Sequence, residues 1–152
     1  MRIAWTLLVF FGFLYGAQQV EVTAKRFEAD QQKLVTKFFG NVVFKRGSDT
    51  IRSQKAYIHF NKDKKPIKFH AIGSVKFELS DEGKQYKGHC DELIYYPKKK
   101  EYILIGNVYV EQQPDNRRIF ADRATIDLIS GNVDMEAKGE KPVKLIFEVE
   151  EK

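Results

Sequence analysis

The feature that most constrains this chain is a glycine that returns every 33 residues, each time ahead of a short, mostly apolar run. The copies read GNVVF from Gly40, GSVKF from Gly73, GNVYV from Gly106 and, in outline only, GEKPV from Gly139. Repeats of about this length are common in helical arrays. The residue types between the glycines therefore decide the architecture.

The segments between the glycines predict β-strands. Apolar side chains recur at every second position, as expected for a strand with one buried face. No segment after residue 17 keeps a helical period over three turns. The clearest alternations are AYIHF (56–60), LIYY (93–96), ATIDL (124–128) and VKLIFEVEE (143–151), and turn-forming residues fall at 46–49, 61–66, 80–83, 97–100, 114–116 and 130–132. Each repeat is predicted to be two long strands of a continuous antiparallel meander.

The predicted inward positions slip once in the first strand of each unit, with a step of three residues instead of two. A slip of one residue turns every later side chain to the other face, so a repeated slip predicts a bulge or corner. The glycines can mark the matching corner in the returning strand, because glycine tolerates a sharp bend. The inward runs are Ile51, Ser53, then Ala56, Ile58, Phe60; Gly88, Cys90, then Leu93, Tyr95; and Ile119, Ala121, then Ala124, Ile126, Leu128.

These corners predict an all-β fold in which strands pass from one sheet to another. We expect an open β-jellyroll of two bent antiparallel sheets, V-shaped, built from about four strand-hairpin repeats of ~33 residues. An N-terminal signal helix is expected to precede it.

Residues 1–17 predict that signal peptide. Arg2 supplies one positive charge, about thirteen apolar residues follow, and the segment ends on the small residues Gly16 and Ala17. The apolar run is shorter than the ~20 residues of a typical spanning helix. Tyr15 is large for the position two before the cut, so an uncleaved inner-membrane anchor is the alternative. Residues 18–152 are expected to form one domain.

Charge and cysteine content exclude few functions. The chain has 26 basic and 21 acidic residues, spread along its length, which fits a solvated surface or weak attraction to an anionic partner such as a phosphate-bearing lipid. Cys90 is the only cysteine, so no internal disulfide can form. We expect a buried small side chain there, with intermolecular pairing as the alternative.

No residue pattern predicts catalysis, a metal site or a cofactor. His89 and Cys90 are neighbours in a predicted strand and so point to opposite faces, which prevents them from acting as a base and a nucleophile. His59, His70 and His89 lack metal-ligand spacing. No phosphate-binding glycine loop occurs. The chain is therefore expected not to be an enzyme, and nothing beyond its modest charge favours nucleic acid.

The predicted interior and the two terminal strands each allow two interpretations. The interior is either a filled core or an apolar cavity between splayed sheets. The first and last strands are edges that either pair between molecules, head to tail, or are protected by charges such as Lys144 and Glu148. The candidate end-to-end residues are Val20, Val22, Val143, Leu145, Phe147 and Val149.

Several segments resemble the OstA-like family of periplasmic lipopolysaccharide-transport bridge proteins (LptA-like). They are FFGNVVFKRG (38–47), IRSQKAYIHF (51–60), KGHCDELIYY (87–96), YILIGNVYVEQ (102–112) and IFADRATIDLISGNVDMEAKG (119–139). The resemblance covers residues 20–147. Two departures are Pro97, where a family member can place another inward apolar residue, and Ser53 with Gln54, where Ala-Asp is commoner.

The resemblance implies a jellyroll, open at both ends, whose apolar groove shelters the acyl chains of lipid A. It also implies head-to-tail stacking between an LptC-like inner-membrane subunit and an LptD-like outer-membrane translocon. Alternatives are an anchored LptC-like subunit, or a structural β-repeat protein with a solid core. The candidate groove residues are Val20, Val22, Phe38, Val42, Phe44, Ile58, Phe60, Val75, Phe77, Leu93, Tyr95, Leu104, Val108, Val110, Ile126 and Leu128. Lys45, Arg46, Lys76, Arg117 and Arg118 are candidates for the lipid's phosphates.

Overall fold

A computed structural model describes residues 7–10 and 19–150, and in these ranges the regular secondary structure is entirely β, as predicted. Eleven strands form one antiparallel sheet. Their bounds are β1 (Leu7–Phe10), β2 (Gln19–Thr23), β3 (Arg26–Asp30), β4 (Val35–Arg46), β5 (Asp49–Phe60), β6 (Pro66–Asp81), β7 (Lys84–Tyr96), β8 (Glu101–Gln113), β9 (Arg117–Asp127), β10 (Val133–Glu136) and β11 (Lys144–Ile146).

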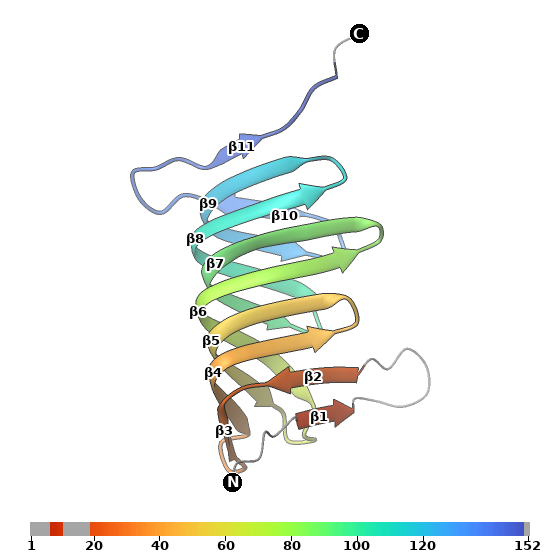
Figure 1. Ribbon diagram of the computed structural model, residues 1–152, viewed down its shortest axis with the longest axis vertical. Coiled ribbons are helices and arrows are strands. Elements are labelled where there is room, and N and C mark those ends of the chain that lie inside the picture. Colours follow the sequence, from red (N-terminus) through yellow and green to blue (C-terminus); the bar gives the residue numbers. More distant parts are fainter. Residues whose placement is uncertain (1–6, 11–18, 151–152) are drawn as a thin grey trace.

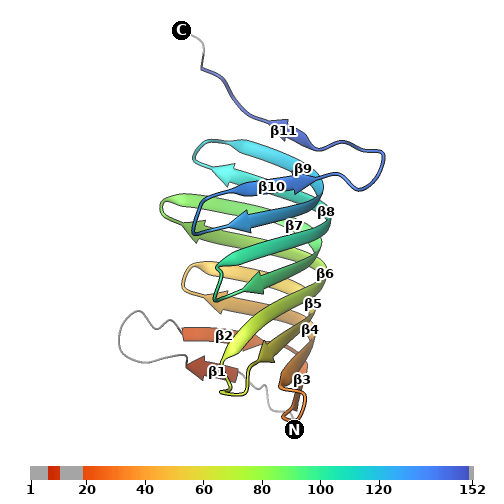
Figure 2. The same cartoon turned by 180° about the vertical axis from the view of Figure 1, so that it is seen from behind.

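The sheet is a meander bent double. Strands β4 to β9 pair with their sequence neighbours. At the two ends of the sheet, β2 and β3 each pair with one half of β4, and β10 and β11 each pair with one half of β9. Figures 1 and 2 show the two halves of every long strand as the front and back of a flattened coil.

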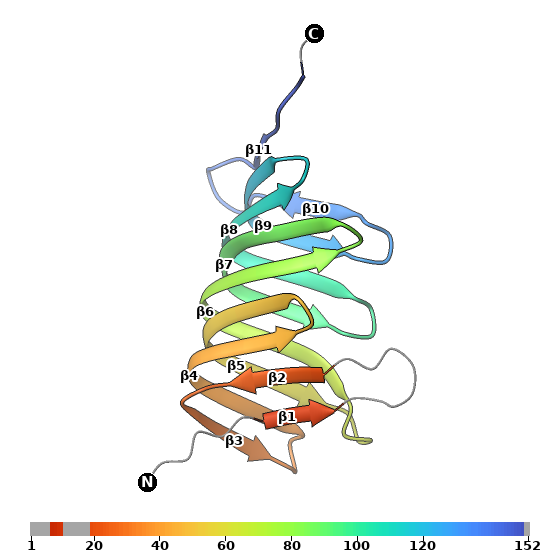
Figure 3. The ribbon, with the colours of Figure 1, turned by 45° about the vertical axis from the view of Figure 1, so that its right-hand side comes forward.

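We call these two layers leaf 1 and leaf 2. Leaf 1 contains β2, β11 and residues 42–46, 49–53, 75–81, 84–90, 108–113 and 117–121; leaf 2 contains β3, β10 and residues 35–39, 55–60, 66–72, 92–96, 101–105 and 123–127. No strand of the described residues joins the N-terminal end, β1 to β3, to the C-terminal end, β10 and β11. The leaves are therefore continuous through the bends, and no strand pairing joins them at the strand ends, which we call the mouth (Figure 3).

The bends lie where the sequence predicts them. In β4, β6 and β8 the pairing register shifts across a glycine with φ of +85°, +92° and +81°, respectively. The next residue, Asn41, Ser74 or Asn107, also has positive φ. Two successive left-handed residues turn the strand sharply, and glycine adopts the first of them without steric cost.

Each of these glycines is also packed against a side chain from an earlier corner. A Cβ on Gly106 would lie 2.4 Å from Asp91 Oδ2, and one on Gly73 would lie 2.6 Å from Gln54 Oε1. Gln54 therefore covers Gly73 as Asp91 covers Gly106. Gly40 is covered in the same way by Lys25, at 2.9 Å.

The fourth glycine keeps only part of this arrangement. Gly139 lies outside the strands, and its backbone N–H donates to Asp122 Oδ2 at 3.2 Å, as the N–H of Lys138 does at 2.7 Å. The Asp122 carboxylate thus binds the backbone at the fourth glycine, although the strand has already ended. The regular repeat stops here, since β10 ends at Glu136 and the chain then crosses from leaf 2 to β11 in leaf 1.

The two ends differ from expectation. The alternating run 143–149 predicts a full strand, but only Lys144–Ile146 pairs, and it pairs with residues 118–120. At the other end, Leu7–Phe10 forms a strand on β2 where the sequence predicts a signal helix. An unpaired strand edge is a ready template for an extended segment, which accounts for this pairing. The predicted cleavage site after Ala17 lies outside the described residues.

Gly88 gives a direct test of close backbone packing. A Cβ at this position would lie 1.9 Å from the carbonyl oxygen of Tyr109 and 3.0 Å from Phe77 Cζ, whereas a Cβ on Gly139 would meet nothing within 4 Å. We expect Gly88→Ala to lower the free energy of unfolding by about 3 kcal/mol, since backbone cannot move aside cheaply. Gly139→Ala should change it by less than about 0.5 kcal/mol. Urea denaturation measures both, and equal effects would contradict the packing.

Candidate functional site: the interior and its mouth

The predicted groove residues all face the space between the leaves. Fourteen of the sixteen are buried, and Phe60 and Leu128 pack against them as partly buried side chains. The alternation along each strand, including the slip at each corner, therefore agrees with the sequence. Cys90 is buried with them, as expected, and is 3% exposed.

These side chains bring the leaves into contact. The ring of Phe44 in leaf 1 lies 4.4 Å from that of Phe69 in leaf 2, centroid to centroid. Tyr95 and Tyr102 stack at 4.4 Å on the inner face of leaf 2 near the mouth. The middle of the interior is thus a packed apolar core.

A polar clasp joins the leaves at the mouth. The Arg46 guanidinium at the end of β4 donates to the hydroxyl of Tyr95, 2.8 Å away in leaf 2, and lies over its ring at 4.9 Å. It also pairs with Asp49 at 3.2 Å, and the other oxygen of Asp49 accepts from the N–H of Ser80 at 2.9 Å. We call Arg46, Tyr95 and Asp49 the clasp. No buried side-chain polar atom among the described residues lacks a partner.

The clasp is charged on the leaf 1 side and neutral on the leaf 2 side. Burial acts to lower the pKa of Arg46, yet its pKa is raised overall because Tyr102, Tyr95 and Asp49 favour the charged form. Burial raises the pKa of the Tyr102 hydroxyl beneath it, so that hydroxyl stays protonated. A partly buried ion pair with further hydrogen bonds retains its strength, whereas an exposed one is weakened by solvent.

The leaves separate at the C-terminal end of the mouth and leave a cavity of about 460 Å³. We call it the end cavity. Its apolar wall combines Ile119 of β9, Val133 and Met135 of β10, and Val143 and Leu145 at β11. The exposed Lys84 and Arg117 stand at its rim, the buried Tyr86 and Gln112 also line it, and none of the described lining residues is a carboxylate. The end cavity can therefore hold an apolar chain beneath an anionic group.

The sequence pattern identified only part of this cavity. Ile119 was predicted to face inward, and Val143 and Leu145 were predicted at an end-to-end interface. Lys84, Val133 and Met135 were missed. The alternation of Val133 and Met135 opposite Ile126 and Ala124 was a usable signal, because residues paired across strands share a face.

The predicted phosphate-binding cations lie in two places, at the mouth and on the outer face of leaf 1. Arg46 and Arg117 lie at the mouth, as described above. Lys45, Lys76 and Arg118 pair with Thr50, Arg52 and Glu111 on the outer face of leaf 1, so they do not reach the interior from that position. One-residue alternation along β4, β6 and β9 accounts for this division.

The predicted interface residues also divide. Val20 and Val22 are 6% and 1% exposed, so their side chains belong to the core and only the backbone of β2 can form an edge. Val143, Leu145, Phe147 and Val149 are 37%, 53%, 56% and 71% exposed, an unusual gathering of apolar side chains at one end of the molecule.

His89 and Cys90 lie on opposite faces of β7, as predicted, with His89 on the exposed side. Burial raises the pKa of the Cys90 thiol to about 12, and its Sγ donates to the carbonyl of Glu92 at 3.2 Å. The described residues contain no group of three or more His, Cys, Asp or Glu side chains placed to hold a metal ion. Within those same residues, no helix has the length and hydropathy needed to cross a bilayer.

With this geometry in place, comparison with known proteins identifies the family. Residues 21–132 match the family described as "LptA/(LptD N-terminal domain) LPS transport protein". The chain belongs to this family. The resemblance seen in the sequence is therefore confirmed, and the matched residues run from β2 to the turn before β10.

Curated relatives within the family have low sequence identity to this chain. The chain is 26% identical over 102 residues to the lipopolysaccharide export system protein LptA of Escherichia coli strain K12, and equally so to LptA of Shigella flexneri. The match covers 65% of this chain and 55% of each relative, so the chain spans about half the length of these proteins.

A solved relative confirms the fold. The crystal structure of LptH, the LptA-homologous periplasmic component of the lipopolysaccharide transport device of Pseudomonas aeruginosa, superposes with a TM-score of 0.75. The superposition covers 86% of this chain and 95% of LptH at 16% identity. The bent, open sheet is thus the fold that LptH adopts.

The clasp can be tested by removing one hydroxyl. Tyr95→Phe deletes the acceptor for Arg46 and should lower the free energy of unfolding by about 1.5 kcal/mol, because the lost hydrogen bond is charge-assisted. Tyr96→Phe is the matched control, since no hydrogen bond to its hydroxyl occurs in the described residues and the substitution should cost less than about 0.5 kcal/mol. Urea denaturation compares them. A neutral Tyr95→Phe would show that the clasp contributes nothing to holding the leaves together.

Proposed function

We propose that the chain is a periplasmic carrier of lipopolysaccharide that shelters lipid A acyl chains between its two leaves. The observation that carries this proposal is the end cavity, an apolar space between the leaves of an unclosed sheet with cations at its rim. Removing ~10 methylenes of one acyl chain from water contributes about 8 kcal/mol, so shelter alone is a sufficient driving force. Such transport needs no covalent chemistry.

Acyl chains enter, in this proposal, at the end cavity and advance by separating the leaves. The leaves of one molecule touch at Phe44 and Phe69 and are clasped at Arg46 and Tyr95. An acyl chain replaces one apolar contact with another as it advances, so the cost of separating the leaves is largely offset. Arg117, which lines the end cavity, can bind a phosphate of the headgroup at the mouth.

The acyl site is tested at Leu145, which lines the end cavity and is 53% exposed. Leu145→Glu places a charge among apolar side chains and should weaken binding of a fluorescent lipid A analogue at least ~tenfold. Ile129→Glu is the matched control, because Ile129 is 71% exposed and is not among the residues lining the end cavity. Its affinity should stay within about twofold of wild type.

The outcomes of this titration are separable. Absence of saturable uptake by the wild-type chain would overturn the carrier proposal in favour of a structural β-repeat protein with a solid core. Equal losses in both variants would place the acyl site elsewhere.

We further propose that copies stack head to tail, β2 of one molecule against the C-terminal end of the next, and that LptC-like and LptD-like partners of the same fold cap the stack. Two features support this proposal. The β2 edge accepts an antiparallel strand, here β1, and the C-terminal end exposes Phe147 and Val149 beyond the short β11. Two different edges of one chain make a heterologous contact, which extends into an open stack.

Stacking is tested with Phe147→Glu/Val149→Glu. Two charges on the joining segment should convert concentration-dependent oligomers into monomers in sedimentation velocity, because strand addition would bury them. The control is Ile67→Glu on the central strand β6, where Ile67 is 45% exposed. Its oligomers should match those of wild type. Unchanged oligomers in the C-terminal variant would contradict stacking through this end.

The membrane-anchored alternative differs at the N-terminus. A mature chain that begins at Gln18 supports the periplasmic bridge, whereas an intact N-terminus recovered from membranes supports an LptC-like anchored subunit. Mass spectrometry of the protein purified from cells distinguishes the two.

A further inference from the structure

The outer face of leaf 1 carries a continuous row of rings and cations. Arg52, Lys76, His89, Tyr109, Phe120 and Lys144 lie opposite one another in register across six strands. The His89 and Tyr109 rings are 5.5 Å apart, the Tyr109 and Phe120 rings 4.9 Å, and Lys144 Nζ is 5.5 Å from the Phe120 ring. Outer faces of antiparallel sheets are ordinarily solvated and polar. This row of exposed rings is therefore a candidate ligand-binding surface.

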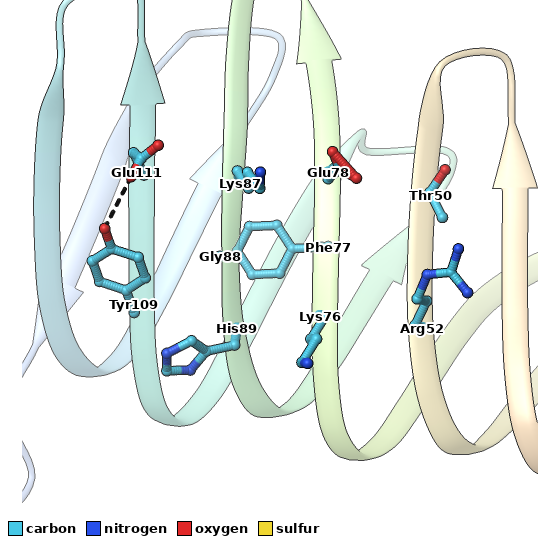
Figure 4. Close-up of a pocket in the computed structure, with 10 residues that line it drawn as sticks. All are labelled: Thr50, Arg52, Lys76, Phe77, Glu78, Lys87, Gly88, His89, Tyr109 and Glu111. Atoms are coloured by element: carbon cyan, nitrogen blue, oxygen red, sulfur yellow. Dashed lines mark hydrogen bonds between the residues drawn. The ribbon is translucent and has the colours of Figure 1, made fainter.

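A second row of side chains lies beside the first on the outer face of leaf 1, and a hollow lies between the two rows. The hollow has a volume of about 360 Å³ and crosses β5 to β8, with the first row on one side and Thr50, Glu78, Lys87 and Glu111 on the other (Figure 4). Its floor is formed by Phe77 and Gly88, which lie between the two rows (Figure 4). We call this the outer hollow.

The charges in the outer hollow are free to bind a ligand. Arg52, Lys76 and Lys87 form no ion pair within 4.0 Å with any carboxylate of the described residues. Of the two carboxylates, Glu111 accepts from the Tyr109 hydroxyl at 3.1 Å, and Glu78 has no such partner. The hollow therefore presents unpaired cations, a free carboxylate and a ring face within one small space.

This combination fits a phosphorylated saccharide. Cations bind phosphate, carboxylates accept hydrogen bonds from sugar hydroxyls, and an aromatic face covers the C–H face of a sugar ring. An acyl chain is excluded because it would leave five charged side chains without water or partners.

The outer hollow also lies within reach of the mouth. Glu78 and Lys87 are each three residues from the ends of their strands, Asp81 and Lys84, which corresponds to roughly 10 Å at ~3.3 Å per residue. A saccharide joined to acyl chains between the leaves can therefore fold over this rim. Thr50, in the same row, directly follows Asp49 of the clasp.

We propose that the outer hollow binds the phosphorylated saccharide portion of the carried lipid, while the leaves hold its acyl chains. This inference rests on the proposed function and adds a second subsite on the opposite face of leaf 1. Lys76 and Lys87 contact phosphate, and Tyr109 stacks on a sugar ring. Binding of the saccharide does not require the leaves to separate.

The experiment uses the phosphorylated oligosaccharide obtained by complete deacylation of lipopolysaccharide, titrated into the full chain by calorimetry. Tyr109→Ala should weaken the affinity about tenfold, the usual effect of losing one stacking ring. Tyr57→Ala is the matched control, because Tyr57 lies on the outer face of leaf 2 beside His70 and under Lys37, with the same neighbours in kind. It should alter the affinity less than about twofold. The dephosphorylated oligosaccharide should bind more weakly than the phosphorylated one, and the difference should shrink with salt.

The outcomes separate this inference from the proposed function. A fluorescent long-chain fatty acid, which has an acyl chain but no saccharide, is titrated in parallel and should bind the wild-type and Tyr109→Ala chains equally. Acyl uptake with no saturable oligosaccharide binding, or equal losses in Tyr109→Ala and Tyr57→Ala, would overturn the outer hollow and leave the carrier standing. Oligosaccharide binding without acyl uptake would overturn the carrier, and with it the assignment of the saccharide to a lipid.

Discussion

The double left-handed turn in β4, β6 and β8 is the constraint on which the rest of this structure depends. A flat antiparallel meander would expose one face of every strand, whereas a bend near the middle of each strand folds the sheet onto itself and buries that face. Glycine followed by asparagine or serine provides this turn at residues 40–41, 73–74 and 106–107. Side chains from the preceding corners then cover the glycines, so the bends are packed as well as permitted. Because every strand bends at the same level, both leaves stay continuous.

Because the sheet is bent but not closed, the packing of its interior changes from one end of the molecule to the other. Near the middle the leaves touch through large rings and are held at the mouth by the clasp. Towards the C-terminal end, β10 and β11 are short and leave the end cavity. Apolar contacts between leaves are non-directional, so they can be replaced by a ligand without loss, whereas the directional hydrogen bonds of the clasp must be broken. The clasp is therefore the part of the interior that resists opening most specifically.

Much of this fold can be read from the sequence because the strand period is strict. The three-residue step from Ser53 to Ala56, and from Cys90 to Leu93, fixed the position of each corner without coordinates. What could not be predicted depends on pairs that are distant in sequence. Arg46 meets Tyr95 only because the leaves face each other with β4 opposite β7, and no local pattern encodes that contact. The end cavity was identified only in part for a related reason, since the alternation at 143–149 predicts a long strand and says nothing about where pairing stops. Gly139 shows the limit of counting glycines, because its spacing is kept although the strand has ended.

The repeat has a consequence for the length of the molecule. Each 33-residue unit pairs its strands only with those of its neighbours, so the sheet behaves as a one-dimensional array whose two ends are specified separately from its middle. Excision of one unit between equivalent corners would shorten the array by two strand spacings, roughly 10 Å. Both termini would keep their own edges. The length of such a chain can thus change in fixed increments, one repeat at a time, while the surfaces at its two ends stay the same.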